Sequence, residues 1–410
     1  MDMPEYIGIG EIVLLSITRF WPVWLAIAGV LAAGWPLRGR LGVFGRLYGS
    51  PIGMVGLIVV LFWVFTAIFV DAIAVKQALE QPTMTAEFIQ DVRNLKKGLP
   101  GVIEGRTGIA FIWGGDNLGR DIFSRVVHGS RIVLVIAPTA TLIAYMVGAT
   151  LGLPAGYFRG WADSISSFLA NLILAFPIIL LFYLLVTPEV NKPHPVDLGL
   201  FTIPWSIPIA LAAVFFLFPI IFLCTMWFTK YENNKTKLTV YLGVTLTLGF
   251  WLYSGLVFNS DPLGIVSMDP NELNVFAAVI LGSSPGVFRI VRGLTMDIMT
   301  RDYVAAAQTR GERPWYIMLW EILPNARGPL IVDFCLRIGY TTILLGTLGF
   351  FGLGLAPESP DWGSMINHGR QFVRLFNTAH IALFPALALM SLVLGLNLLA
   401  DGLREESLKD

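Results

Sequence analysis

The chain has 410 residues, of which 55% are hydrophobic and only 14% are charged, and its formal net charge is zero. Soluble domains usually carry about a quarter charged residues, so this composition excludes an ordinary soluble protein. The balanced charge gives no basic surface for nucleic acid. The charged residues lie in short clusters between long apolar runs, which is typical of helices that cross a membrane.

A membrane-spanning helix needs about 20 mostly apolar residues. The first segment of this kind, residues 17–36, is the weakest, because Arg19 and Pro22 lie within it and it could instead lie along the membrane interface. In all we expect nine spans, at residues 17–36, 51–73, 131–156, 165–187, 206–228, 239–258, 273–291, 328–355 and 380–400.

Lysine and arginine residues are concentrated in three stretches, at residues 37–50, 229–238 and 292–327. The short segments predicted on the opposite side, 188–205 and 259–271, contain a single lysine between them. Because basic residues are enriched in cytoplasmic loops, we expect the three basic stretches and the C-terminus in the cytoplasm and the N-terminus outside.

The chain contains no GxxxxGK[ST] phosphate-binding loop, no Ser/His/Asp constellation and no HExxH spacing. Its two cysteines, Cys224 and Cys335, lie in apolar runs, which favours buried thiols over a disulfide framework or a zinc site. The sequence therefore predicts neither an enzyme nor a cofactor-binding or metal-binding protein.

The stretch from 292 to 327 is charged and amphipathic, and it lies between two predicted spans. Three consecutive alanines, residues 305–307, favour a helix, Gly311 permits a turn, and Pro324 is expected to end the second apolar part before the next span. Two short helices bent at a glycine would form a compact knob that fits a groove on a soluble partner. The alternative is an ordinary interfacial helix with snorkelling arginines.

This stretch resembles the EAA loop of ABC importer permeases, in which Glu-Ala-Ala is followed by three residues, a glycine and, about a dozen residues later, Leu-Pro. Ala305 stands where the family has glutamate. The resemblance implies a coupling helix that docks on a separate ATPase subunit, and the residues concerned are Tyr303, Ala306, Ala307, Gly311, Leu323 and Pro324.

A second resemblance precedes the second core span. The run GGDNLGRDIFSRVVHGSRI is similar to the LGTDxxGRD signature of dipeptide, oligopeptide and nickel permeases, although Gly115 replaces the threonine. Without the family, this run predicts only a helix start with acidic residues in its first turn. The matching residues are Asp116, Gly119, Arg120, Asp121, Ser124 and Arg125, with Gly129 and Arg131 beyond them.

Two further runs match the same family. Residues 174–177 read LAFP, and the run that begins GFFGLG is similar to the end of the fifth core span and the loop after it. Leu345 stands where the family usually has an acidic residue. Apart from the resemblance, Gly352 and Gly354 are expected to let helices approach closely. The residues that fit in this last run are Gly352, Gly354, Pro360, Trp362 and Gly363.

The resemblance implies an all-α polytopic fold with a six-helix, MetI-like importer core and about three extra spans. The core spans would be 51–73, 131–156, 165–187, 273–291, 328–355 and 380–400. The corresponding division of the chain is an N-terminal extra helix with a cytoplasmic linker (1–50), a first core helix with a periplasmic loop (51–130), a permease core (131–402) with an inserted helix pair at about 188–270, and a cytoplasmic tail (403–410).

The function implied is that of a permease subunit in the bacterial inner membrane, which forms half of a translocation pathway for peptides. The partners implied are a second permease subunit in a heterodimer, two subunits that bind the ATP, and a periplasmic or lipid-anchored solute-binding protein. A nickel, opine or sugar importer of the same family remains an alternative. So does an ion-coupled transporter that uses Asp333 and Arg337, although a mutual partnership of this pair is the favoured interpretation.

The fifth core span carries small and hydroxyl side chains through its predicted external half. Such residues would suit a translocation path, where helices separate and rejoin, or equally static packing of the small-xxx-small type. The candidate pathway residues are Thr341, Thr342, Gly346, Thr347 and Gly349.

Overall fold

A computed structural model describes residues 5–6, 9–40, 42–74, 101–103, 109–116, 120–187, 194–197, 202–258, 261, 270–353, 359–376 and 379–407. The chain forms two compact units, Met1–Ala137 with Ile338–Asp410, and Pro138–Arg337. Helices α7 (Ile122–Phe158) and α17 (Arg327–Phe350) contribute residues to both.

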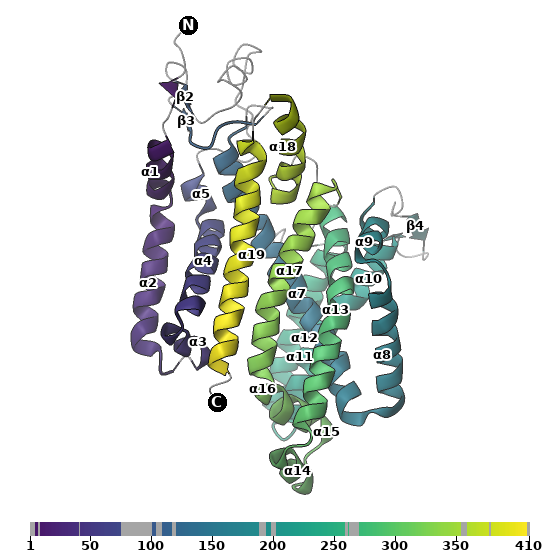
Figure 1. The fold of residues 1–410 in the computed structure, drawn as a ribbon. Coiled ribbons are helices and arrows are strands. Elements are labelled where there is room, and N and C mark those ends of the chain that lie inside the picture. Colours follow the sequence, from purple (N-terminus) through teal and green to yellow (C-terminus); the bar gives the residue numbers. More distant parts are fainter. Residues whose placement is uncertain are drawn as a thin grey trace. The chain divides into compact units, whose positions relative to one another are not determined.

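The first unit contains both chain ends. Its remaining elements are β1 (Glu5–Tyr6), α1 (Ile9–Arg19), α2 (Trp21–Leu37), α3 (Val43–Arg46), η1 (Leu47–Gly49), α4 (Pro51–Ile68), α5 (Val70–Ile73), β2 (Gly101–Ile103), β3 (Ile109–Phe111), α18 (Trp362–Phe376) and α19 (His380–Ser407) (Figure 1).

The second unit is continuous in sequence. Besides its parts of α7 and α17 it contains α8 (Gly160–Ala175), α9 (Ile178–Val186), β4 (His194–Asp197), β5 (Thr202–Trp205), α10 (Ile207–Phe215), α11 (Leu217–Tyr231), α12 (Lys235–Phe258), α13 (Pro270–Ile298), α14 (Asp302–Thr309), α15 (Pro314–Tyr316), the π-helical turn η2 (Ile317–Ile322) and α16 (Leu323–Asn325).

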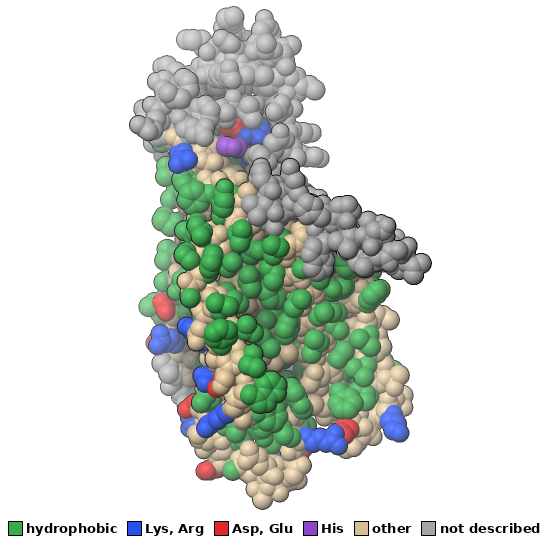
Figure 2. Space-filling view, turned by 90° about the vertical axis from the view of Figure 1, so that its right-hand side faces the viewer, with side chains coloured by type: hydrophobic (Ala, Val, Ile, Leu, Met, Phe, Trp, Pro, Cys, Tyr) green, Lys and Arg blue, Asp and Glu red, His purple; other side chains and the backbone are tan. Residues whose placement is uncertain are grey.

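Among the described residues, seven helices are long and apolar enough to cross a membrane, and the number rises to nine if each of two bent helix pairs is one span. Large hydrophobic side chains are exposed along these helices, and on the face shown in Figure 2 they cover a broad band with charged side chains below it. The fold is thus a polytopic helical membrane protein, as predicted.

Two predicted spans are sharply bent. The segment predicted at 165–187 is two helices, α8 and α9, bent by 87°. The bend lies in the LAFP run, where Phe176 is extended with ψ of 135° before Pro177, because a proline disfavours helical backbone in the residue that precedes it. The segment predicted at 17–36 is likewise a pair, α1 and α2, bent by 58°.

Short strands were not predicted, because pieces of two to four residues carry no periodic pattern. β1, β2 and β3 form a three-stranded antiparallel sheet, and β4 pairs with β5. The helical patches expected at 75–98 lie outside the described residues. The predicted domain boundaries stay a prediction.

In the first unit, α4 and α19 pack closely through glycines. Ser50 caps α4 by accepting a hydrogen bond from the Gly53 N–H at 3.2 Å. A Cβ on Gly53 would lie 3.1 Å from the Cα of Gly402, and one on Gly395 would lie 2.7 Å from Val59. The glycines therefore let the backbones of the two helices approach closely, as small residues do between membrane helices.

In the second unit, three glycines four residues apart form a ridge on α7. Side chains at Gly148, Gly152 and Gly156 would collide with α13, which presents Val287, Val291 and Thr295 to this ridge. Residues at this spacing share one helical face. The ridge therefore sets α7 against α13, and the buried cluster at this contact extends to the stretch that follows α13.

Candidate functional site

The predicted helix–turn–helix after α13 is present. Helix α14 covers Asp302–Thr309, and Gly311 follows with φ of +77°, a conformation that glycine adopts readily. The Gly311 N–H donates to the Gln308 carbonyl at 3.0 Å, and the Glu312 N–H donates to the Ala307 carbonyl at 3.2 Å. These bonds close the C-terminus of α14 and fix the bend.

Ala306 and Ala307 lie on opposite faces of α14. Val304 and Ala307 are fully buried in the cluster shared with α7 and α13, whereas Tyr303, Ala305 and Ala306 are exposed. In the second unit, α14 and α15 project beyond the ends of α8 and α13 (Figure 1). The exposed face of α14 thus offers small side chains to a partner, while its other face is anchored.

The second apolar part ends one residue after Pro324, because α16 stops at Asn325 and α17 starts at Arg327 after a turn at Ala326. The chain continues through η2 into α16, and the Leu323 N–H donates to the carbonyl of Met318, five residues earlier. Proline has no N–H to donate, and widening the preceding turn to π-helical geometry accommodates it. Such π-bulges are frequent at functional sites.

Helices α11 and α12, which lie in the segment predicted to be an insertion, contact this loop, and the sequence did not predict this contact. Glu232, in the turn between α11 and α12, forms an ion pair with Arg313 at 2.5 Å. The Trp320 indole N–H donates to the Thr229 hydroxyl at 3.1 Å, and the Lys230 ammonium lies 4.5 Å from the Trp320 ring centroid. The 229–238 turn and the loop 303–324, called the coupling loop after the role that the family resemblance implies, therefore lie at the same end of this unit, as the charge pattern indicated.

The second signature forms a tightly bonded turn before α7. Asp116 accepts from the Arg120 backbone N–H at 2.9 Å and pairs with its guanidinium at 2.7 Å. Asp121 accepts from the Ser124 N–H at 2.9 Å and so caps α7, which confirms the predicted helix start. Gly119 lies outside the described residues.

The same signature clamps the loop after α17. Arg125 donates to the Ser359 carbonyl at 3.2 Å, and the fully buried Trp362 donates its indole N–H to the Val126 carbonyl at 2.9 Å. A Cβ on Gly129 would lie 2.7 Å from the Trp362 ring. The two family motifs, which are more than 200 residues apart in the sequence, therefore pack against each other.

Gly352 has a different role from the one expected. It has φ of +71°, and a Cβ at this position would meet no atom within 4 Å, so no helix approaches it. The Leu353 N–H donates to the Leu348 carbonyl at 2.8 Å, which closes a Schellman-type end of α17. α17 therefore ends at Phe350 rather than near 355, and Gly354 lies outside the described residues.

The two glycines among the candidate pathway residues pack against other elements of the first unit. Thr341 and Thr342 are 2% and 1% exposed. Side chains at Gly346 and Gly349 would collide with Leu389 and Asp361 respectively, and Thr347 is partly buried. Packing thus explains both glycines, and the role of the five residues in a pathway stays a prediction.

Asp333 and Arg337 of α17 pair with each other at 2.6 Å, as favoured from the sequence. The Tyr145 hydroxyl of α7 donates to the same Asp333 oxygen. The Arg337 guanidinium also donates to the Ser283 carbonyl of α13 at 3.5 Å. This polar cluster links three helices of the second unit.

The fold and these sites define a multi-pass helical membrane protein with a protruding helix and turn between two of its long helices. A family described as binding-protein-dependent transport system inner membrane component matches residues 198–405. This chain belongs to that family, the permease subunits of ABC importers, which work in complexes with other subunits.

Named relatives are similar over most of the chain. The glutathione transport system permease protein GsiD of Pectobacterium atrosepticum is 32% identical over 292 residues, 71% of this chain and 70% of that protein. The dipeptide transport system permease protein DppC of Alkalihalophilus pseudofirmus is 25% identical over 362 residues, 88% and 87%. A GsiD of Escherichia coli is 30% identical over 293 residues, 72% and 70%.

Proposed function

We propose that this permease subunit carries peptides or peptide-like solutes across the bacterial inner membrane. The similarity to relatives named for glutathione and dipeptide transport supports this substrate class. Its partners would be a second permease subunit in a heterodimer, two ATP-binding subunits and a periplasmic or lipid-anchored solute-binding protein. ATP would be bound by the partner subunits, without a cofactor in this chain.

The observation that carries the proposal is the construction of the segment 303–324. One face of α14 is exposed and has small side chains, the opposite face is buried, and the bend at Gly311 is fixed by backbone hydrogen bonds. A protruding helix on a rigid base can transmit force in both directions between a partner and the membrane helices. We assign this segment as the docking site for an ATPase subunit, so it would lie in the cytoplasm.

Gly311→Leu tests this assignment. A leucine at positive φ costs about 1–2 kcal/mol, and no neighbouring atom lies within 4 Å, so the change reshapes the turn without a collision. We expect the variant to insert normally but to lose uptake while ATP hydrolysis continues in the assembled transporter.

Gly293→Leu is a matched control, because Gly293 also has no atom within 4 Å but lies in α13 with helical backbone. It should retain uptake. Normal transport by Gly311→Leu would refute the docking assignment.

The substrate class needs a separate test. The solute-binding protein of the assembled transporter should be purified, and the molecules it carries identified by mass spectrometry. A peptide or peptide-like thiol supports the proposal, whereas a nickel chelate, an opine or a sugar as the bound molecule would contradict it without affecting the docking assignment.

A further inference from the structure

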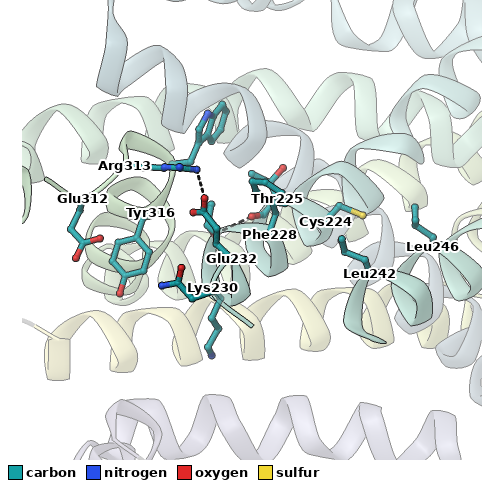
Figure 3. A pocket seen from close by; sticks show the side chains of 13 residues that line it. Cys224, Thr225, Phe228, Lys230, Glu232, Leu242, Leu246, Glu312, Arg313 and Tyr316 are labelled. Atoms are coloured by element: carbon teal, nitrogen blue, oxygen red, sulfur yellow. Dashed lines mark hydrogen bonds and ion pairs between the residues drawn. The ribbon is translucent and has the colours of Figure 1, made fainter. Parts of the chain in front are cut away.

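A cavity of about 830 Å³ lies between the inserted helices α11 and α12 and the coupling loop (Figure 3). It is entirely within the second unit. Its size falls in the range of about 300–1,000 Å³ that is usual for small-molecule sites. It is open to the surroundings rather than enclosed, so a ligand can enter it from the side.

The two ends of this cavity differ in chemistry. In Figure 3, Cys224, Leu242 and Leu246 lie at one end, while Glu312, Arg313 and Tyr316 lie at the other. The arrangement suits an amphiphilic ligand, with one apolar part and one charged or polar part.

The apolar end lies on membrane-spanning helices. α11 and α12 belong to candidate spans, and Leu246 follows the start of α12 at Lys235 by 11 residues, which is about 16 Å along a helix. Leu246 and Phe228 are 52% and 50% exposed. The medium at this depth is lipid, so an acyl chain is the apolar group available to fill this end.

The polar end is lined by Lys230, Glu232, Glu312 and Arg313, and Lys235 begins α12 two residues after the lining residue Asn233. Arg313 is already paired with Glu232 at 2.5 Å, and Glu312 lies 3.9 Å from Arg310. Three lysines at the ends of α11 and α12 make no ion pair with any carboxylate in the described part of the chain, namely Lys230, Lys235 and Lys237. A negatively charged headgroup complements this end, and basic pockets between membrane helices bind such headgroups.

We propose that this cavity binds one anionic phospholipid, with its phosphate at the lysine-rich end and an acyl chain along α11 and α12. A lipid in this position contacts both the inserted helices and the coupling loop, and it reinforces the bonds that Glu232 and Thr229 make to that loop. The proposal concerns lipid binding, and it stands whether or not the transported solute is a peptide.

The test uses the full-length protein in nanodiscs that contain a trace of photoactivatable phosphatidylglycerol, or of the phosphatidylcholine with the same acyl chains. After illumination, cross-linked peptides are mapped by mass spectrometry. We expect the anionic probe to label peptides containing residues 224–228 and 242–246 several times more strongly than the zwitterionic probe.

Charge and shape are tested separately. Lys230→Gln should lower the preference for the anionic probe about fivefold, and Lys235→Gln should do so as well. Arg40→Gln, an exposed position in the other unit, is the matched control and should leave it unchanged. Leu246→Trp should reduce labelling at the apolar end, because the larger side chain occupies part of the cavity. Leu246 is about half exposed, so the indole should fit without disturbing the packing of α12.

Three results would overturn the proposal. Equal labelling by the two probes would indicate ordinary surrounding lipid. An unchanged preference in both lysine variants would show that these lysines do not hold the headgroup. Loss of labelling in millimolar inorganic phosphate would indicate a site for a free anion instead.

Discussion

The ion pair between Asp333 and Arg337 provides the sharpest test of the packing described for the second unit. Asp333 contacts Arg337 and the Tyr145 hydroxyl, and the guanidinium lies against α13, where a Cβ on Gly286 would come within 2.7 Å of it. Asp333→Asn removes the negative charge with little change in shape. Arg337 is then left as an uncompensated cation within a predicted membrane span.

The expected cost follows from burial. Breaking a fully buried ion pair by removing one partner costs about 3–5 kcal/mol. The side chains of Arg337 and Asp333 are 17% and 19% exposed, so partial contact with solvent reduces the penalty, and we expect about 2–4 kcal/mol. Removing both charges should cost much less, since no uncompensated charge remains.

The assay is a double-mutant cycle with Asp333→Asn, Arg337→Met and the combined variant. Each protein is purified in the same detergent, its yield is measured by size-exclusion chromatography, and its melting temperature is measured by thermal unfolding. We expect both single variants to melt well below the wild type and the combined variant to recover most of the loss. A combined variant at least as unstable as the sum of the two single variants would refute the reasoning.

Three further predictions follow from single positions. Gly349→Leu should destabilise the protein by about 1–3 kcal/mol or more, because its side chain would collide with Asp361. The amount of folded protein in the membrane should therefore fall. Normal yield with blocked uptake would instead support a pathway role. Burial raises the pKa of the Asp361 carboxyl, so its contribution to stability is lost as the pH rises through that pKa. Asp361→Asn, which keeps an acceptor for the Ser364 N–H, should therefore melt above the wild type at pH 8 and lose this advantage toward pH 4, as thermal unfolding at several pH values would show. Finally, a cysteine at Asn234, in a cysteine-free background, should resist an impermeant thiol reagent added outside right-side-out vesicles, and labelling there would contradict a cytoplasmic 229–238 turn.

The sequence predicted the helical membrane fold, the cap of α7 and the bend at Gly311 because each depends on a local pattern. Apolar runs of membrane length, an aspartate three residues before a serine, and a glycine after a short alanine helix need no knowledge of distant residues. The position of the break between α8 and α9 was equally local, since Pro177 was visible, but the length of the apolar run favoured a continuous span.

What the sequence could not supply was contact between distant segments. Nothing near Trp320 indicates that its indole N–H bonds to Thr229, 91 residues away. Likewise Gly129 matched the family signature, but nothing in the sequence indicated that Trp362 lies against it. Gly346 and Gly349 of α17 could not be assigned to a pathway or to packing from the sequence, because the choice depends on which element faces them.

The inserted helices limit how this permease can be simplified by engineering. A shortened protein without residues 188–270, the segment predicted to be an insertion, would keep every motif that the family resemblance identified, since none of them lies in it. It would nevertheless remove the residues that contact the coupling loop, because the Trp320 indole would lose its hydrogen bond to Thr229 and Arg313 would lose its ion pair with Glu232. A working minimal version would therefore need compensating changes in the loop itself, and moving this loop into another permease should fail unless α11 and α12 are moved with it.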